Sequence, residues 1–247
     1  MSNTTTKVVL STLLVLAALA WLRLIAVLPR FRARPVKRKR GSPTHLLIVL
    51  GSGGHTAEMM YMLDNAVFGA PLEQTKRRRL NWSNYTHRTW VVSSGDSVSA
   101  TRAKDFEEKV RAESGADCGT YEVVSVPRAR KIYQPLWTSP ISCLHCGWEC
   151  AKLLIWGRKG FPDLIMTNGP ATATVLIFTC VLLRLLNVRG CDSQGKMRTI
   201  YVESWARVKK LSLSGRCLCW VADRVLVQWE ELKGAGGRAE FHGVLCF

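Results

Sequence analysis

The chain has 247 residues, which is enough for one domain with a sizeable core or for two small ones. Its formal net charge of +17 predicts an anionic neighbour, which could be anionic lipid, a phosphate-bearing ligand or nucleic acid. Nine cysteines at irregular spacing argue against a small secreted disulfide scaffold, so we expect most of them to be reduced and buried.

The first predicted element is an apolar helix over Val8–Leu28, long enough to cross about 30 Å of hydrocarbon. Arg23, its one charged residue, lies near the end, where its side chain can reach the headgroups. A cleaved signal peptide is the alternative, because Ala18–Ala20 resembles a cleavage site. Only Lys7 precedes the apolar run, whereas basic residues follow it: Arg30, Arg32, Arg34 and Lys37–Arg40. The positive-inside rule therefore predicts an uncleaved anchor, with residues 1–7 lumenal and the rest cytosolic.

Residues 29–43 are basic and punctuated by Pro and Gly, so we expect a linker. The run Arg30–Arg40 would lie against the anionic leaflet, where each charge near the surface contributes about 1 kcal/mol. A nuclear-localisation signal or a nucleic-acid site is the alternative for this run. A second basic cluster, Lys76–Arg79, opens a polar insertion, Lys76–Arg88, that we expect to be exposed. Neither cluster has the interleaved aromatic residues of a single-strand binder, so we expect no nucleic-acid partner.

Residues 44–247 are expected to form one cytosolic domain, in which strands alternate with helices. We predict strands at His45–Leu50, Thr89–Ser93, Thr120–Val126, Asp163–Thr167, Arg198–Val202 and Arg224–Gln228. The predicted helices are Thr56–Asn65, Ser97–Ser114, Thr138–Trp156 and Ala173–Leu186. This alternation predicts an α/β, Rossmann-like, doubly wound parallel sheet. The last helix is too short to span a membrane, so we expect a core helix, with a membrane-dipping helix as the alternative.

A glycine-rich loop follows the first predicted strand and opens the first helix of the domain. Backbone N–H groups at such a helix start bind anions, so the loop predicts a diphosphate site made by Gly51, Ser52, Gly53, Gly54, His55 and Thr56. It lacks the Lys-Ser/Thr of a P-loop, and the glycine spacing and distal acidic residue of a dinucleotide fingerprint. A tight turn that needs glycine for steric reasons is the alternative, and His55 could also be a helix-capping residue.

Two more polar loops follow strands, at Asn168–Thr172 and Glu203–Arg207. In open α/β sheets ligands bind at this edge, so we expect a cleft lined by Asn168, Gly169, Glu203, Ser204 and Arg207. Glu203 is the candidate catalytic residue, by position alone. Three cysteines have metal-ligand spacing, but on a helix they would share one packing face, so we expect no metal there: Cys143, Cys146 and Cys150.

At this point several segments together indicate a family. They are LIVLGSGGHTAEM (Leu47–Met59), VPRAR (Val126–Arg130), PDLIMTNGP (Pro162–Pro170), YVESWARVKKLSLSG (Tyr201–Gly215) and ADRVLVQW (Ala222–Trp229). Over nearly its whole length the chain resembles the membrane-anchor subunit of the UDP-N-acetylglucosamine transferase of the dolichol pathway. It departs from that family at Ala171, where glycine is usual.

The resemblance implies the N-terminal, acceptor-binding half of a GT-B glycosyltransferase, as in the bacterial lipid-linked N-acetylglucosaminyltransferase. Such a subunit is not catalytic on its own. It recruits a soluble catalytic subunit to the cytosolic face of the endoplasmic reticulum, in a heterodimer or larger complex, with the nuclear envelope as an alternative location. The complex uses UDP-GlcNAc to add the second GlcNAc to GlcNAc-diphosphate-dolichol in N-glycan precursor synthesis, and this chain itself is expected to bind no cofactor.

Independently, the residues after the linker fit one doubly wound domain and not two, so a second half is expected from another chain. The family also implies that the apolar tail packs against the partner, through Phe241, Val244, Leu245 and Phe247. A final edge strand of the chain's own sheet is the alternative. A self-sufficient homodimeric glycosyltransferase and a scaffold without a ligand are the other functional hypotheses.

Overall fold

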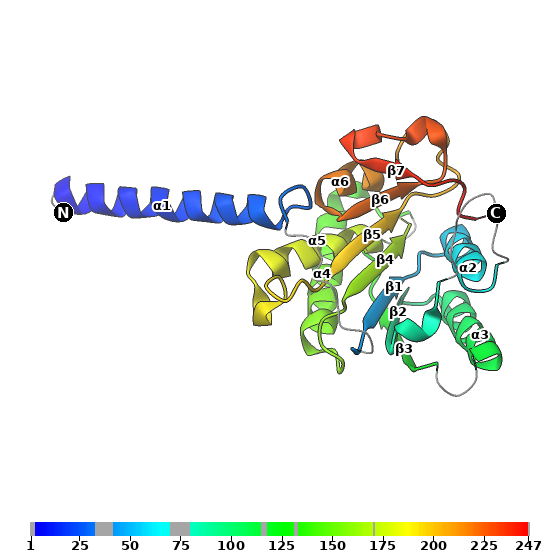
Figure 1. The fold of residues 1–247 in the computed structure, drawn as a ribbon. Coiled ribbons are helices and arrows are strands. Elements are labelled where there is room, and N and C mark those ends of the chain that lie inside the picture. Colours follow the sequence, from blue (N-terminus) through cyan, green and yellow to red (C-terminus); the bar gives the residue numbers. More distant parts are fainter. Residues whose placement is uncertain are drawn as a thin grey trace.

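A computed structural model describes residues 3–32, 42–69, 80–114, 118–130, 133–169 and 171–246. Its centre is a seven-stranded sheet of order β3-β2-β1-β4-β5-β6-β7, in which every neighbouring pair is parallel. The strands are β1 His45–Val49, β2 His87–Ser93, β3 Thr120–Val126, β4 Leu164–Asn168, β5 Arg198–Val202, β6 Arg224–Val227 and β7 Ala239–Phe241. The predicted doubly wound parallel sheet is therefore confirmed (Figure 1).

Helices cover both faces of this sheet: α2 Gly54–Val67, α3 Ser97–Ser114, α4 Ser139–Trp156, α5 Thr172–Leu185 and α6 Leu213–Val221. Strand β1 is buried throughout, and its side chains alternate between two cores. Leu46 and Ile48 pack with α2 and α3, whereas Leu47 and Val49 pack with α4 and α5. Helix α5 is largely buried, which supports a core helix at this position.

The strand order reverses beside β1. From β1 the chain winds outward through β2 to β3, then returns to β4 and winds the other way to β7. Crossovers that leave in opposite directions open a crevice at the carboxyl ends of the two strands, here β1 and β4. The fold therefore brings together the loops that follow these two strands.

The predicted insertion Lys76–Arg88 is wrong at its C-terminal end, while Lys76–Arg79 lie outside the described residues. Trp82 is buried in the core beside α3, and β2 begins at His87. Arg88 is fully buried, and its guanidinium donates to the Glu107 carboxylate of α3 and to the Cys118 carbonyl. An arginine is tolerated inside a core only when it is paired in this way, and the pairing partner lies too far along the chain to be recognised in the sequence.

Helix α1, Asn3–Val27, projects from the domain as a single long rod (Figure 1). Residues Thr5–Val27 are long and apolar enough to cross a membrane, with a mean hydropathy of 2.3. Its last turn packs on the domain, with Val27 buried against α5 and α6. The helix thus extends a few residues beyond the predicted Val8–Leu28 at its N-terminal end.

Two arginines fix α1 to the domain. Arg23 donates to the carbonyls of Arg184 and Leu185 and to Asp192, at 2.7, 3.2 and 2.9 Å. The expectation that Arg23 reaches toward the headgroups is therefore wrong. Arg32, which was assigned to the linker, is buried and pairs with Asp192 and Asp223.

All nine cysteines are free, and seven of them are buried, which agrees with the expectation. Cys146 and Cys150 lie in the core between α4 and the sheet. Among the described residues, no group of three His, Cys, Asp or Glu side chains could hold a metal ion.

Candidate functional site

The glycine-rich loop joins β1 to α2, and two of its glycines are needed for the backbone path. A Cβ on Gly51 would lie 2.6 Å from that of His55, and Gly53 has a φ of 63°, which favours glycine. The hydroxyl of the buried Thr56 is used inside the loop, where it donates to the Gly51 carbonyl and contacts Ser99. The steric alternative is thus part of the explanation, and the diphosphate-binding role of Thr56 stays a prediction.

The same loop opens on a pocket. A Cβ on Gly53 or Gly54 would meet nothing within 4 Å, so the start of α2 is accessible from outside. No side chain caps this helix, so its first N–H groups remain available to a ligand. The pocket, of about 600 Å³, is also lined by Ser52, Asp96, Ser99, Arg102 and Arg128. A helix N-terminus and two guanidinium groups facing one space favour an anion.

A second pocket, of about 400 Å³, lies against the ends of β1 and β4. Its lining includes Gly51, Ser52, Arg128, Arg130, Tyr133, Asn168 and Ala171–Ala173. Arg128 borders both pockets, and its Nε donates to the Ser94 carbonyl at 3.3 Å. Sequence reasoning did not select Arg128 and Arg130 as site residues. Their signal was available, because they directly follow strand β3 at the same edge.

Four polar side chains meet beside the glycine loop. Asn168 donates through Nδ2 to Glu58 at 3.0 Å, and Ser204 donates to the other oxygen of Glu58 at 2.7 Å. Because the Asn168 amide nitrogen is used in this way, its oxygen accepts, so His55 Nδ1, at 3.2 Å, carries the proton. The other ring nitrogen, Nε2, belongs to a side chain that is 29% exposed.

Glu58 contacts the other three side chains of this cluster, and the sequence pattern does not single it out as a site residue. Burial by itself would raise the pKa of its carboxyl. The contacts with His55, Asn168 and Ser204 outweigh burial, so the pKa of Glu58 lies below its ordinary value. A charged Glu58 therefore holds the loops after β1, β4 and β5 together, with Gly169 packed closely under the His55 ring.

Glu203 faces inward. Its carboxylate accepts hydrogen bonds from the Tyr201 hydroxyl, the Ser204 N–H and the Ser212 N–H and hydroxyl, at 3.3, 3.2, 3.0 and 3.0 Å. A Cβ on Gly215 would come within 2.0 Å of this carboxylate, so α6 closes over it. Burial, with the Glu203 carboxylate beside it, raises the pKa of Tyr201. These contacts favour a positioning role, and the catalytic role of Glu203 stays a prediction.

The structure brings most of the predicted cleft residues together, but not all of them. Asn168, Gly169 and Ser204 lie in the Glu58 cluster, whereas Arg207 lies on an exposed turn beyond it. Arg207 is held to this turn by a backbone hydrogen bond to the Ser204 carbonyl at 3.0 Å. Ala171 lies at φ 34°, a conformation that favours glycine, at the position where the family usually has one.

The C-terminal tail is built into the domain. Phe241 pairs with Val227 in β7, so the alternative of a final edge strand holds for this residue. The chain then returns across the sheet to α2, where Leu245 and Cys246 join the core (Figure 1). Val244 is half-buried, and Phe247 lies outside the described residues. Docking of a partner on this tail stays a prediction.

Taken together, the fold and the site define a doubly wound α/β protein with a crevice, lined by arginines and a helix N-terminus, at the switch point of its sheet. The chain matches the family described as "Oligosaccharide biosynthesis protein Alg14 like" over residues 46–245. The chain belongs to this family, which confirms the resemblance found in the sequence.

The matched relatives are named as transferase subunits. UDP-N-acetylglucosamine transferase subunit ALG14 of Yarrowia lipolytica is 37% identical over 243 residues, which is 98% of this chain and 99% of the relative. The Rattus norvegicus protein of the same name is 32% identical over 219 residues, which is 88% of each chain. Among solved structures, MurG of Acinetobacter baumannii overlaps with a TM-score of 0.45 and 12% identity, over 81% of this chain and 45% of MurG.

Proposed function

We propose that this chain is the membrane-anchored, acceptor-binding subunit of a UDP-N-acetylglucosamine transferase on the cytosolic face of the endoplasmic reticulum. The names of its relatives support the class of enzyme, and the apolar helix α1 supports the anchor. The complex would transfer GlcNAc from UDP-GlcNAc to GlcNAc-diphosphate-dolichol. A soluble partner subunit would bind the donor and complete the cleft, while this chain would hold no cofactor of its own.

The observation that carries the acceptor role is the anion-binding pocket at the start of α2. A lipid-linked diphosphate has two negatively charged phosphate groups, and their oxygen atoms accept hydrogen bonds. The uncapped N–H groups of α2, together with Arg102 and Arg128, offer donors and positive charge that match such a group. His55 Nε2, on the first turn of α2, would accept a hydrogen bond from a sugar hydroxyl or, when it carries a proton, donate to a phosphate oxygen.

The half-enzyme role is supported by the architecture of the described residues. They form one anchor and one doubly wound sheet, and the polar loops at the carboxyl edge of that sheet line open pockets. A transferase that works between two domains needs a second wall facing this edge. The partner subunit would supply that wall and the groups that bind UDP.

Binding and turnover separate the hypotheses. The purified full-length chain should bind a short-chain prenyl-diphosphate-GlcNAc in calorimetry, and should give no product with UDP-GlcNAc until the partner is added. Arg128→Ala should weaken acceptor binding by about tenfold or more, since a hydrogen bond to a charged group contributes about 1.5–3 kcal/mol. Arg111→Ala, on an exposed position at the far end of α3, is the matched control and should bind normally.

Two outcomes would overturn the proposal. Transfer by this chain alone would support a self-sufficient homodimeric enzyme. Unchanged binding and unchanged complex activity in both Arg128→Ala and Gly53→Val would leave the loop a structural turn and the chain a scaffold.

A further inference from the structure

Helix α4 presents an apolar stripe to the outside of the domain. Trp137, in the short turn before the helix, is 83% exposed, and Ile141, Leu144 and Trp148 are 74%, 75% and 60% exposed. Their spacing of four, three and four residues places them on one side of the helix. The opposite side of α4 is already used, because Cys146, Cys150 and Leu154 pack on the sheet. Among the residues that the structure describes, the stripe is therefore an unpartnered face and not a fault in the core.

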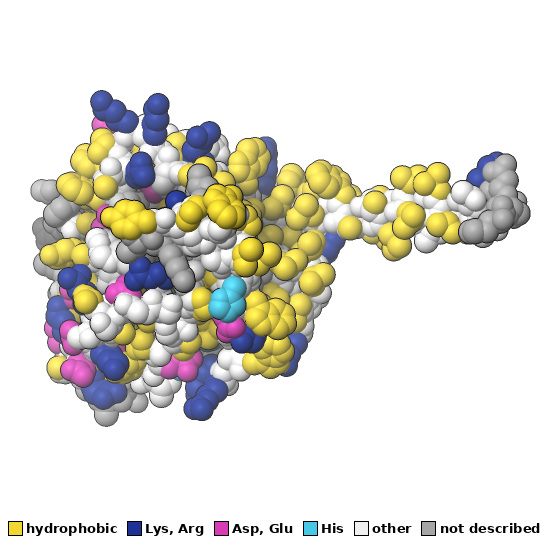
Figure 2. Space-filling view, turned by 180° about the vertical axis from the view of Figure 1, so that it is seen from behind, with side chains coloured by type: hydrophobic (Ala, Val, Ile, Leu, Met, Phe, Trp, Pro, Cys, Tyr) yellow, Lys and Arg dark blue, Asp and Glu magenta, His cyan; other side chains and the backbone are white. Residues whose placement is uncertain are grey.

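The stripe is continuous with the anchor. A Cβ on Gly147 of α4 would lie only 3.6 Å from Val175 of α5, so these two helices pack closely. Helix α5 adds further exposed apolar side chains, Phe178, Leu182 and Leu186, and it contacts the last turn of α1. Figure 2 shows hydrophobic side chains continuing from the base of α1 onto the adjoining face of the domain.

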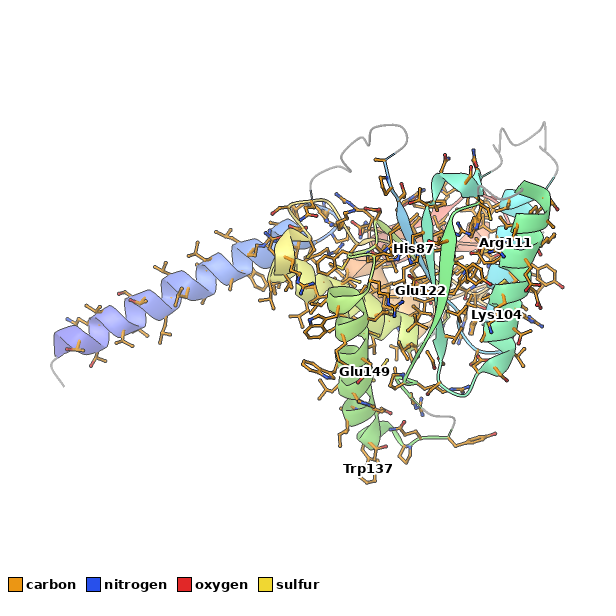
Figure 3. The ribbon with its side chains drawn as sticks, turned by 90° about the horizontal axis from the view of Figure 1, so that it is seen from below. His87, Lys104, Arg111, Glu122, Trp137 and Glu149 are labelled. Atoms are coloured by element: carbon orange, nitrogen blue, oxygen red, sulfur yellow. The ribbon has the colours of Figure 1, made fainter. Side chains whose placement is uncertain are left out.

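The direction of the anchor places this face at membrane level. Arg23 and Arg32 fix α1 to the domain, so the axis of α1 defines the membrane normal relative to the sheet. In Figures 1 and 3, α4 lies on the side of the sheet nearest α1 and runs across its axis. Trp137, at the start of α4, lies on this side in Figure 3, whereas Arg111 lies on α3 on the far side. A helix that crosses the axis of a spanning helix lies parallel to the membrane plane.

Charge favours a lipid surface over a protein as the occupant of this face. The segment from Arg128 to Lys159 carries one carboxylate, Glu149, and that group pairs with Lys152 at 2.7 Å. The basic residues of the segment are Arg128, Arg130, Lys131, Lys152, Arg158 and Lys159. Apolar side chains that include tryptophan, flanked by basic groups, are typical of helices that lie in the interface of an anionic bilayer.

We propose that α4 is a second membrane contact, with Trp137, Ile141, Leu144 and Trp148 embedded in the cytosolic leaflet beside the anchor. This inference rests on the proposed function. Tyr133 and Arg130, just before α4, line the pocket at the ends of β1 and β4. Embedding α4 brings the mouth of that pocket to the leaflet, so a lipid-linked diphosphate keeps its chain in the bilayer while its headgroup reaches Arg128.

The test uses the full-length chain in anionic phospholipid vesicles. In a background with Cys143→Ser and Cys217→Ser, single cysteines at three exposed positions carry an environment-sensitive fluorophore: Leu144→Cys on α4, Leu14→Cys on α1 and Ala112→Cys on α3. Nitroxide-labelled lipids then quench any label inside the bilayer. We expect strong quenching at positions 14 and 144 and little at position 112.

The outcomes separate this inference from the anchor. Quenching at position 14 with none at 144 would overturn the second contact and leave the anchor intact. No quenching at position 14 would overturn the anchor, and this inference with it. Protection of position 144 only after the partner subunit is added would make the stripe a protein interface.

An activity measurement gives an independent readout. In the assembled complex, Ile141→Lys with Leu144→Lys should raise the KM for a bilayer-embedded acceptor several-fold. It should leave the KM for a water-soluble short-chain acceptor unchanged. Ala112→Lys, which places a charge on an exposed apolar position at the far end of α3, is the control and should change neither value. An equal change for both acceptors would overturn the proposal.

Discussion

Asp223 is the counter-ion that joins the end of the anchor to the domain. Its carboxylate accepts hydrogen bonds from Arg32, Arg184 and Arg198, at 3.1, 3.0 and 3.2 Å, and from the N–H and hydroxyl of Thr199. Arg184 is fully buried and Arg32 nearly so. We predict that Asp223→Asn, which keeps the shape and removes the charge, is strongly destabilising.

The magnitude follows from the burial of the partners. Removing one member of a buried ion pair costs about 3–5 kcal/mol, because the remaining charge is left uncompensated. For a domain of this size 1 kcal/mol lowers the Tm by about 2–4 °C, so Asp223→Asn should lower it by roughly 6–20 °C. Asp105→Asn, an exposed aspartate on α3, is the matched control and should change the Tm little.

The pH dependence gives a second measurement. Burial by itself would raise the pKa of Asp223, but Arg184, Arg32 and the Thr199 N–H lower it below its ordinary 3.8. A carboxyl whose pKa is lower in the folded state stabilises the fold above its unfolded pKa. That contribution is therefore complete above about pH 3.8 and is lost as the pH falls through the lower, folded pKa. Asp223→Asn has no carboxyl at this position, so its stability should not show this loss at acid pH.

Differential scanning fluorimetry of the full-length chain in detergent measures both effects. A drop in Tm no larger than that of Asp105→Asn would refute the reasoning, because it would mean that the three arginines do not need this charge. If the Tm of Asp223→Asn fell with acid pH as much as that of the original chain, the assignment of this pH dependence to Asp223 would be refuted.

Three further substitutions test other parts of the fold and site. Glu107→Ala leaves Arg88 buried and unpaired and should cost about 3–5 kcal/mol in unfolding free energy, whereas its exposed neighbour Glu108→Ala should cost little, in the same thermal assay. Ala171→Gly relieves a left-handed backbone and should raise stability by about 1 kcal/mol, and a lower Tm would contradict the strain. Glu203→Gln should lower the Tm together with turnover if Glu203 positions its loop, whereas lost turnover at an unchanged Tm would favour a catalytic role.

The elements of the fold that could be predicted are those whose pattern lies within a short stretch of sequence. The run His45–Leu50 is apolar without interruption and is followed by glycines, so a buried strand with a ligand loop was visible in the sequence. Helix α6 is not predicted because it is short and its sequence mixes Ser, Gly, Cys and Arg. Strand β7 has only three residues, so the sequence supports it only as an alternative. The burial of Arg88 is not visible in the sequence because the residue that makes it possible lies on a different element.

In the candidate site, too, some features could be predicted from the sequence and others could not. Gly51, His55, Asn168 and Ser204 follow strands directly, and parallel topology brings strand ends together, so their proximity could be predicted. The role of Glu58 could not, because it depends on Asn168 and Ser204, which lie on other elements more than 100 residues further along the chain. The inward direction of Glu203 was likewise set by Gly215, whose missing side chain makes room for the carboxylate.

The return of the C-terminal tail to α2 has a consequence for how the protein is made. Leu245 and Cys246 complete a core whose other members, on α2, left the ribosome about 180 residues earlier. At about 5–20 residues per second this interval is roughly 10–40 s, during which α1 is already available for insertion. The nascent domain therefore keeps one apolar face incomplete until residues 245 and 246 have been made. Stop codons before position 245 should for this reason affect folding as well as assembly.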